Sequence, residues 1–146
     1  MEAELRSVVA YAGSLERAAA RAADAIRRDV GQRWVGIYDV REREIEILGW
    51  SGGGLPAHPR FPVTDGLCGA AVAARATVIA ADVRRDPRYL ETFGTTRSEI
   101  VVPILLEGRV MGLIDVESDR VNAFGAREQE HLERAAAVIS PLWIER

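Results

Sequence analysis

The stretch from residue 97 to residue 118, RSEIVVPILLEGRVMGLIDVES, constrains the fold more than any other part of the chain. On both sides of a Glu107-Gly108 turn its side chains alternate with the period of two that is typical of strands. One face of the expected hairpin is aliphatic, whereas the other ends in three acids, Glu99, Asp115 and Glu117. The pattern predicts a hairpin whose acidic end is either a solvated edge or the wall of a binding site.

The register of this hairpin decides which acids are neighbours. A two-residue turn alone would mix the aliphatic and acidic faces, because a slip of one residue turns every side chain over. A three-residue loop over residues 106–108, with Gly108 left-handed in a bulge, places Glu99 opposite Asp115 and keeps both faces uniform. We predict this second register. Like charges across a strand pair are unfavourable, so the cluster requires Arg97, a metal ion or a ligand ammonium group.

Composition excludes several classes of function. A chain of 146 residues with 48% hydrophobic content is long enough for one domain, residues 1–146, with its own core. A net charge of -3 argues against nucleic acid as a partner. The absence of lysine excludes Walker-type phosphate loops and Schiff-base chemistry. A single cysteine excludes an internal disulfide. The sequence contains no apolar run long enough to predict a membrane span or a signal peptide, so we expect a cytoplasmic protein.

The order of the expected elements predicts an α+β domain. They are a helical region over 2–30 with a break near Gly13 and a Ser14 cap, strands at 33–40 and 45–50, an irregular loop at 51–62, a short helix at 65–74, a strand at 77–81, a long loop at 82–96, the hairpin, and a helix from about Gly125. Terminal helices on one face of a mostly antiparallel sheet leave the other face to the loops. The terminal helices either form a dimer or only cover the sheet.

Aromatic residues and a helix start supply further candidates for a site. Trp34 and Tyr38 share a strand face with Gly36 between them, which leaves a gap that either holds a small ligand or is filled by the aromatics themselves. The helix start at Gly66–Gly69 offers free backbone N–H groups to a ligand carboxylate. Cys68 lies in this first turn, where the helix dipole favours the thiolate, although its small neighbours favour a packed residue.

Four segments together resemble a GAF domain along nearly the whole chain. These segments are DGLCGAA, DVRRDPRY, RSEIVVPI and GRVMGLIDVES, followed by Phe124 and a helix. Within GAF proteins the sequence is most similar to free methionine-R-sulfoxide reductases, which carry a tryptophan and a tyrosine four apart, a VCG turn, an SEIVVP strand and an LDIDS ending. The corresponding residues are Trp34 and Tyr38, then 67–69, 98–103 and 114–118.

The resemblance implies a ligand pocket, and it also implies that this chain lacks two of the cysteines that carry out the family's reaction. Pocket residues of the family match Trp34, Tyr38, Glu99, Asp115 and Glu117, with glutamate at the last position where aspartate is usual. An ammonium group would neutralise the acids.

The family's catalytic and resolving cysteines correspond instead to Thr92 and His58. Sulfoxide reduction needs a thiolate to attack sulfur and a second thiol to resolve the product, and threonine does not replace that thiolate at neutral pH.

Three functions follow from these observations. The first is a non-catalytic, sensor-like module that binds an amino-acid-like molecule, with its ammonium on Glu99, Asp115 and Glu117, its body against Trp34 and Tyr38, and its carboxylate near Gly66, Leu67, Cys68 and Gly69. The second is a reductase that uses Cys68 with an external thiol. The third is a structural homodimer joined through the terminal helices, with an empty pocket. No cofactor is expected. A metal site built from the three acids stays an open alternative, although no histidine lies near them in sequence.

Overall fold

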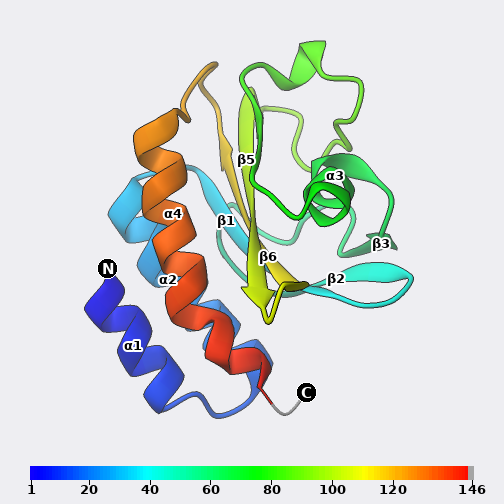
Figure 1. The fold of residues 1–146 in the computed structure, drawn as a ribbon. Coiled ribbons are helices and arrows are strands. Elements are labelled where there is room, and N and C mark those ends of the chain that lie inside the picture. Colours follow the sequence, from blue (N-terminus) through cyan, green and yellow to red (C-terminus); the bar gives the residue numbers. More distant parts are fainter. Residues whose placement is uncertain (145–146) are drawn as a thin grey trace.

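Six antiparallel strands form one sheet in the computed structural model, which describes residues 1–144, and their order is β3-β2-β1-β6-β5-β4. The strands are β1 (Trp34–Val40), β2 (Glu44–Gly52), β3 (Arg60–Pro62), β4 (Val78–Ala80), β5 (Ser98–Leu106) and β6 (Arg109–Ser118). The helices are α1 (Glu2–Ala10), α2 (Leu15–Val30), α3 (Gly66–Ala74) and α4 (Ala126–Ile139), with 3-10 turns η1 (Val83–Arg85) and η2 (Ser140–Trp143). Helices α1, α2 and α4 lie on one face of the sheet and α3 lies on the other (Figure 1), which confirms the predicted α+β arrangement.

The terminal helices and the aliphatic face of the hairpin form the larger core. Ile100 and Val102 of β5 and Ile114 of β6 pack in this core with Leu132 of α4 and the alanine-rich face of α2. Helix α2 begins as predicted, because the Ser14 hydroxyl accepts a hydrogen bond of 3.1 Å from a backbone N–H of its first turn. No helix among residues 1–144 is long and apolar enough to cross a membrane.

The turn between β5 and β6 differs from the predicted one. It is a two-residue turn in which both Glu107 and Gly108 have positive φ, 52° and 78°. Turns with positive φ at both central residues match the natural twist of a hairpin, which explains why this turn is preferred to a three-residue loop. The aliphatic and acidic faces still do not mix, because Met111 forms a bulge on β6. This extra residue shifts the pairing by one position, so that Ile104 pairs with Gly112.

The corrected register changes which acids are paired. Glu99 lies directly opposite Glu117, and Asp115 lies opposite Val101. The prediction that Glu99 faces Asp115 across the hairpin was therefore wrong by two residues. Because two residues is one full period of a strand, all three acids still project from the same face of the sheet, away from α2 and α4.

A second, smaller core lies between this face of the sheet, α3 and the connecting loops. It includes Trp34, Tyr38, Phe61, Leu67 and Leu113. Phe61 belongs to β3, a strand that lies inside the stretch predicted to be an irregular loop. The flanking prolines hide this strand in the sequence, and its place at the edge of the sheet is where proline is tolerated.

Candidate ligand-binding site

The three acids are buried together at the end of the hairpin. Glu99 is 4% exposed, Asp115 1% and Glu117 0%. Charged side chains are almost never buried this deeply unless they are paired. The acidic end of the hairpin is therefore an internal cluster and not a solvated edge.

None of the arginines among residues 1–144 forms an ion pair with this cluster. Arg97, one of the three predicted cations, instead donates hydrogen bonds to the carbonyl oxygens of Gly94 and Thr96 at 3.3 and 2.9 Å. The Thr96 hydroxyl donates to Glu117 Oε1 at 2.7 Å. Asp115 Oδ1 and Glu117 Oε2 are buried without a partner, so two acceptors of the cluster remain unsatisfied.

Burial raises the pKa values of all three acids of the cluster. Loss of hydration raises the pKa of Asp115 to about 6. The same loss of hydration, followed by repulsion from Asp115, raises the pKa of Glu117 to about 8. The pKa of Glu99 is also raised well above its usual range, first by burial and then by the two neighbouring acids. A cation that entered the cluster would relieve this repulsion and favour the ionised carboxylates.

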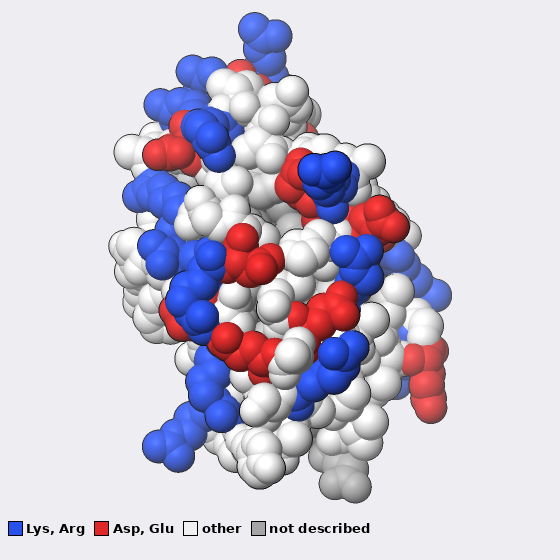
Figure 2. Space-filling view, turned by 90° about the vertical axis from the view of Figure 1, so that its left-hand side faces the viewer, with Lys and Arg blue, Asp and Glu red and all other residues white. Residues whose placement is uncertain are grey.

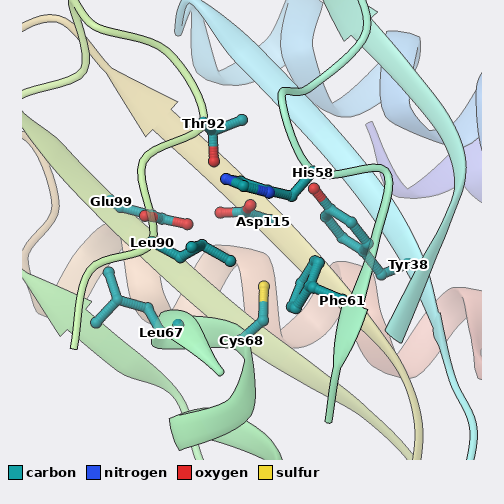
Figure 3. A pocket seen from close by; sticks show the side chains of 10 residues that line it. Tyr38, His58, Phe61, Leu67, Cys68, Leu90, Thr92, Glu99 and Asp115 are labelled. Carbon is teal, nitrogen blue, oxygen red and sulfur yellow. The ribbon is translucent and has the colours of Figure 1, made fainter. Parts of the chain in front are cut away.

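A cavity of about 20 Å³ lies beside Glu99 and Asp115 (Figure 3). Its other lining residues are Tyr38, His58, Phe61, Gly66, Leu67, Cys68, Leu90 and Thr92. This volume accommodates roughly one water molecule. An amino acid is several times larger, so its entry requires the loops that carry His58 and Thr92 to move outward.

The start of α3 forms one wall of the cavity. Asp65 occupies the N-cap position but makes no side-chain hydrogen bond to the helix, and instead its carboxylate accepts one of 3.0 Å from the Thr64 hydroxyl. The helix therefore begins without a side-chain cap beside Gly66, Leu67 and Cys68, which all line the cavity. Such an uncapped start suits an anionic group of a ligand.

Gly69 does not line the cavity, although it was predicted to contact the ligand. Its N–H donates to the Asp65 carbonyl at 2.9 Å within the first turn of α3. A Cβ atom at this position would lie 2.4 Å from the backbone carbon of Thr64. Glycine is therefore needed here for close packing of the chain against itself.

Cys68 is a buried free thiol at the edge of the acidic cluster. Burial, followed by the negative charges of Asp115, Glu99 and Glu117, raises the pKa of this thiol well above its usual range. These effects outweigh the helix dipole, so Cys68 is a packed neutral thiol, as its small neighbours in the sequence favoured. The sulfur lies within 4.8 Å of a carboxylate oxygen from Glu99 and one from Asp115, and these two oxygens also lie within 4.8 Å of each other.

The two aromatic residues of β1 have different environments. Tyr38 lines the cavity and makes an edge contact with the Phe61 ring, with 5.7 Å between ring centroids. Trp34 does not line the cavity. A Cβ atom at Gly36 would lie 2.2 Å from Trp34 Cη2, so the tryptophan ring itself occupies the gap that the sequence left open for a ligand. Its Nε1 donates to the Gly54 carbonyl at 3.0 Å.

The long loop before β5 is anchored over this face by Phe93 and Tyr89. The Phe93 ring contacts the edge of Trp34, with 5.4 Å between centroids, and lies under the guanidinium of Arg33 at 5.2 Å. The Tyr89 hydroxyl accepts from the Thr92 N–H at 3.4 Å. This anchoring holds Thr92 at the cavity.

A family model for the GAF domain matches residues 12–142. The chain therefore belongs to the GAF domain family.

The chain is similar to free methionine-R-sulfoxide reductases and also to a protein described as a GAF sensor. It is 34% identical over 110 residues to the free methionine-R-sulfoxide reductase of Saccharomyces cerevisiae, covering 73% of this chain and 61% of that protein. The structure matches the free methionine-R-sulfoxide reductase of Neisseria meningitidis in complex with its substrate with a TM-score of 0.88 and 29% identity, over 97% of this chain and 84% of that one. A protein from Burkholderia vietnamiensis described as a GAF sensor gives a TM-score of 0.85 and 26% identity, over 95% and 88% of the two chains.

This chain matches less than two thirds of the length of the first curated relatives. The resemblance assigns a cysteine to three positions, and of these the chain keeps only Cys68. His58 and Thr92 occupy two of those positions, and both line the cavity that also contains Cys68 (Figure 3). Sequence reasoning found these positions only through the resemblance. Phe61 and Leu90, which also line the cavity, carried no signal, since each is a single apolar residue in an apparently irregular stretch.

Proposed function

We propose that this protein is a non-catalytic ligand-binding module whose cavity accepts the ammonium group of a small amino-acid-like molecule. The observation that carries the proposal is a buried acidic cluster that no arginine among residues 1–144 neutralises, and in which Asp115 Oδ1 and Glu117 Oε2 have no hydrogen-bond partner among these residues. An ammonium group supplies a positive charge and three donors, so it would offset the charge of the cluster and donate a hydrogen bond to Asp115 Oδ1. Glu117 does not line the cavity, so it would be affected through the charge alone.

The surrounding walls support the orientation of such a ligand. Its ammonium group lies between Glu99 and Asp115, and its carboxylate lies at the uncapped start of α3, beside Gly66. The body of the ligand rests against Tyr38 and Phe61 and not against Trp34, whose ring is packed on Gly36.

Thermal denaturation in the presence of free amino acids and their oxidised forms tests this proposal, with a chelator added to remove metal ions. Binding stabilises the folded state by about 2.7 kcal/mol when the ligand is at about 100 times its Kd. The Asp115→Asn variant is expected to lose most of this stabilisation, because a hydrogen bond to a charged group contributes about 1.5–3 kcal/mol.

Two controls separate recognition of the ammonium group from general effects. Nα-acetylated forms of the same amino acids with uncharged side chains carry no positive charge and are expected to give no stabilisation. Glu130→Gln changes an acid that is exposed on α4 and is expected to leave the stabilisation intact. A library of amino acids that produces no stabilisation of the wild-type protein would contradict the proposal.

A one-cysteine reductase is the second candidate, favoured by the position of Cys68 in the cavity and by the similarity to reductases. In this reaction the Cys68 thiolate attacks the sulfoxide sulfur, methionine leaves, and Cys68 becomes a sulfenic acid. Two equivalents of external thiol then restore Cys68 and form a disulfide and water. Thiol-dependent consumption of free methionine-R-sulfoxide that disappears in Cys68→Ser is the required result. An inactive wild-type protein excludes this candidate.

The homodimer through the terminal helices stays a prediction. The side of the molecule that carries α1, α2 and α4 is polar, with acidic and basic side chains interspersed (Figure 2). Arg28 of α2 forms ion pairs with Glu4 of α1 and with Asp24 of its own helix. Arg134 of α4 forms an ion pair with Glu2 of α1. This polar surface gives no support to an apolar dimer interface of the obligate kind.

A further inference from the structure

Three donor atoms of different chemistry converge beside the cavity. The Cys68 sulfur and one carboxylate oxygen each from Glu99 and Asp115 lie within 4.8 Å of one another. They come from α3, β5 and β6, so only the folded chain brings them together. Asp115 is 1% exposed, and its Oδ1 has no partner.

A fourth donor reaches the same cavity from the loop between β2 and β3. The His58 side chain lines the cavity, and its ring lies between Thr92 and Asp115 (Figure 3). In the sequence, His58 lies far from the acids, in a stretch where no partner is apparent. The folded structure therefore supplies the histidine that a metal site built from the acids alone would lack.

The size and the chemistry of this donor set select a particular class of ion. A cavity of about 20 Å³ holds an ion without any opening of the loops. A thiolate and an imidazole together with carboxylates favour Zn²⁺ and similar divalent transition metals over Mg²⁺ and Ca²⁺, which prefer oxygen ligands only. Tetrahedral coordination of Zn²⁺ places its ligand atoms about 3.5 Å apart, so Cys68, Glu99 and Asp115 need to move inward by about 1 Å. His58 lies outside this group of three and needs to move further.

We infer that this cavity is a binding site for a divalent transition-metal ion of the Zn²⁺ class, with Cys68, Glu99, Asp115 and His58 as its ligands. The ion occupies the acidic cluster in place of the ammonium group of the proposed ligand, so the two compete for one cavity. On binding, the Cys68 thiol releases its proton to solvent and becomes a thiolate ligand.

Titration of the purified, chelator-treated protein with Co²⁺ tests this inference. Cobalt bound to a thiolate gives a sulfur-to-cobalt charge-transfer band in the near ultraviolet, and in a tetrahedral site it gives intense visible bands. Because the chain contains one cysteine, any such charge-transfer band must arise from Cys68. Addition of Zn²⁺ is expected to displace Co²⁺ and remove the bands.

The two histidines of the chain provide a matched pair of variants. Cys68→Ser is expected to abolish the charge-transfer band. His58→Ala removes a ligand from an exposed loop, and we expect the affinity for Co²⁺ to fall by about tenfold or more. His131→Ala, on α4, removes a histidine whose Nε2 lies 2.5 Å from Asp29 Oδ2, and it is expected to change neither the band nor the affinity.

Two results would overturn the inference. One is the absence of a charge-transfer band from the wild-type protein. The other is an affinity for Co²⁺ that is weakened by His131→Ala and not by His58→Ala. Because amino-acid binding is measured separately in the presence of a chelator, failure of the ammonium proposal and failure of the metal site are distinguishable.

Discussion

The free energy of unfolding of the protein without ligand or metal is expected to fall as the pH rises from about 5 to about 8. Asp115 and Glu117 have pKa values of about 6 and about 8 in the folded state, above their ordinary values in an unfolded chain. A group whose pKa is raised on folding contributes stability that is fully present below its unfolded pKa. That contribution is lost as the pH rises through the folded pKa.

The folded state therefore binds more protons than the unfolded state in this window, and each titrating group lowers the stability by up to about 1.4 kcal/mol per pH unit. Glu99 adds to the effect, because its pKa is raised in the same direction. The other titratable groups with raised pKa values that face the cluster are Tyr38, Cys68 and Tyr89. All three stay neutral throughout this window, because burial raises the pKa values of Tyr38 and Cys68 well above their ordinary values and raises the pKa of Tyr89 to about 12.

Urea denaturation at several pH values between about 5 and about 8, in the presence of a chelator, measures this slope. Asp115→Asn is expected to flatten the slope, because it removes both a titrating group and the charge that repels Glu117. Glu130→Gln, at an exposed site on α4, should leave the slope unchanged. Stability that is constant or that increases over this range would show that the cluster is already neutralised by an internal cation.

Replacement of Trp34 by alanine is expected to destabilise the unliganded protein by about 3–5 kcal/mol. The Trp34 side chain is fully buried, its ring packs on Gly36, and its Nε1 bonds to the Gly54 carbonyl. The ring also supports Phe93, which anchors the loop that carries Thr92. Loss of the ring leaves a cavity that the rigid strand β1 does not fill.

Thermal and urea denaturation of Trp34→Ala, Trp34→Phe and Trp50→Ala measure this contribution. Trp34→Phe keeps part of the packing and should lose less stability than the alanine variant. Trp50 is 37% exposed on β2, so Trp50→Ala provides a matched control with a much smaller effect. If Trp34 served mainly as a wall for the ligand, Trp34→Ala would retain the stability of the free protein and lose only binding.

Local patterns in the sequence were sufficient to predict the helices, their faces and every strand except β3. The alternation over residues 97–118 placed Glu99, Asp115 and Glu117 on one face, because the period of two is a property of the strand backbone alone. The Ser14 cap was also predicted correctly, since capping depends on residues within one helical turn. The hairpin register was not predicted correctly. The two-residue turn at Glu107-Gly108 is combined with a bulge at Met111 that shifts the pairing by one residue, and this bulge has no clear signal in the sequence.

The sequence by itself determined that this chain has an acidic strand end, a glycine-rich helix start and one cysteine. Only the tertiary structure decided how these features are used. The fold buries the three acids without an ion pair to any arginine among residues 1–144, and it packs the Trp34 ring on Gly36. It also brought His58 from a separate loop to the cavity that contains Cys68 and Asp115. The physical reason is that burial and proximity depend on contacts between residues distant in the chain, whereas periodicity and capping depend on neighbours.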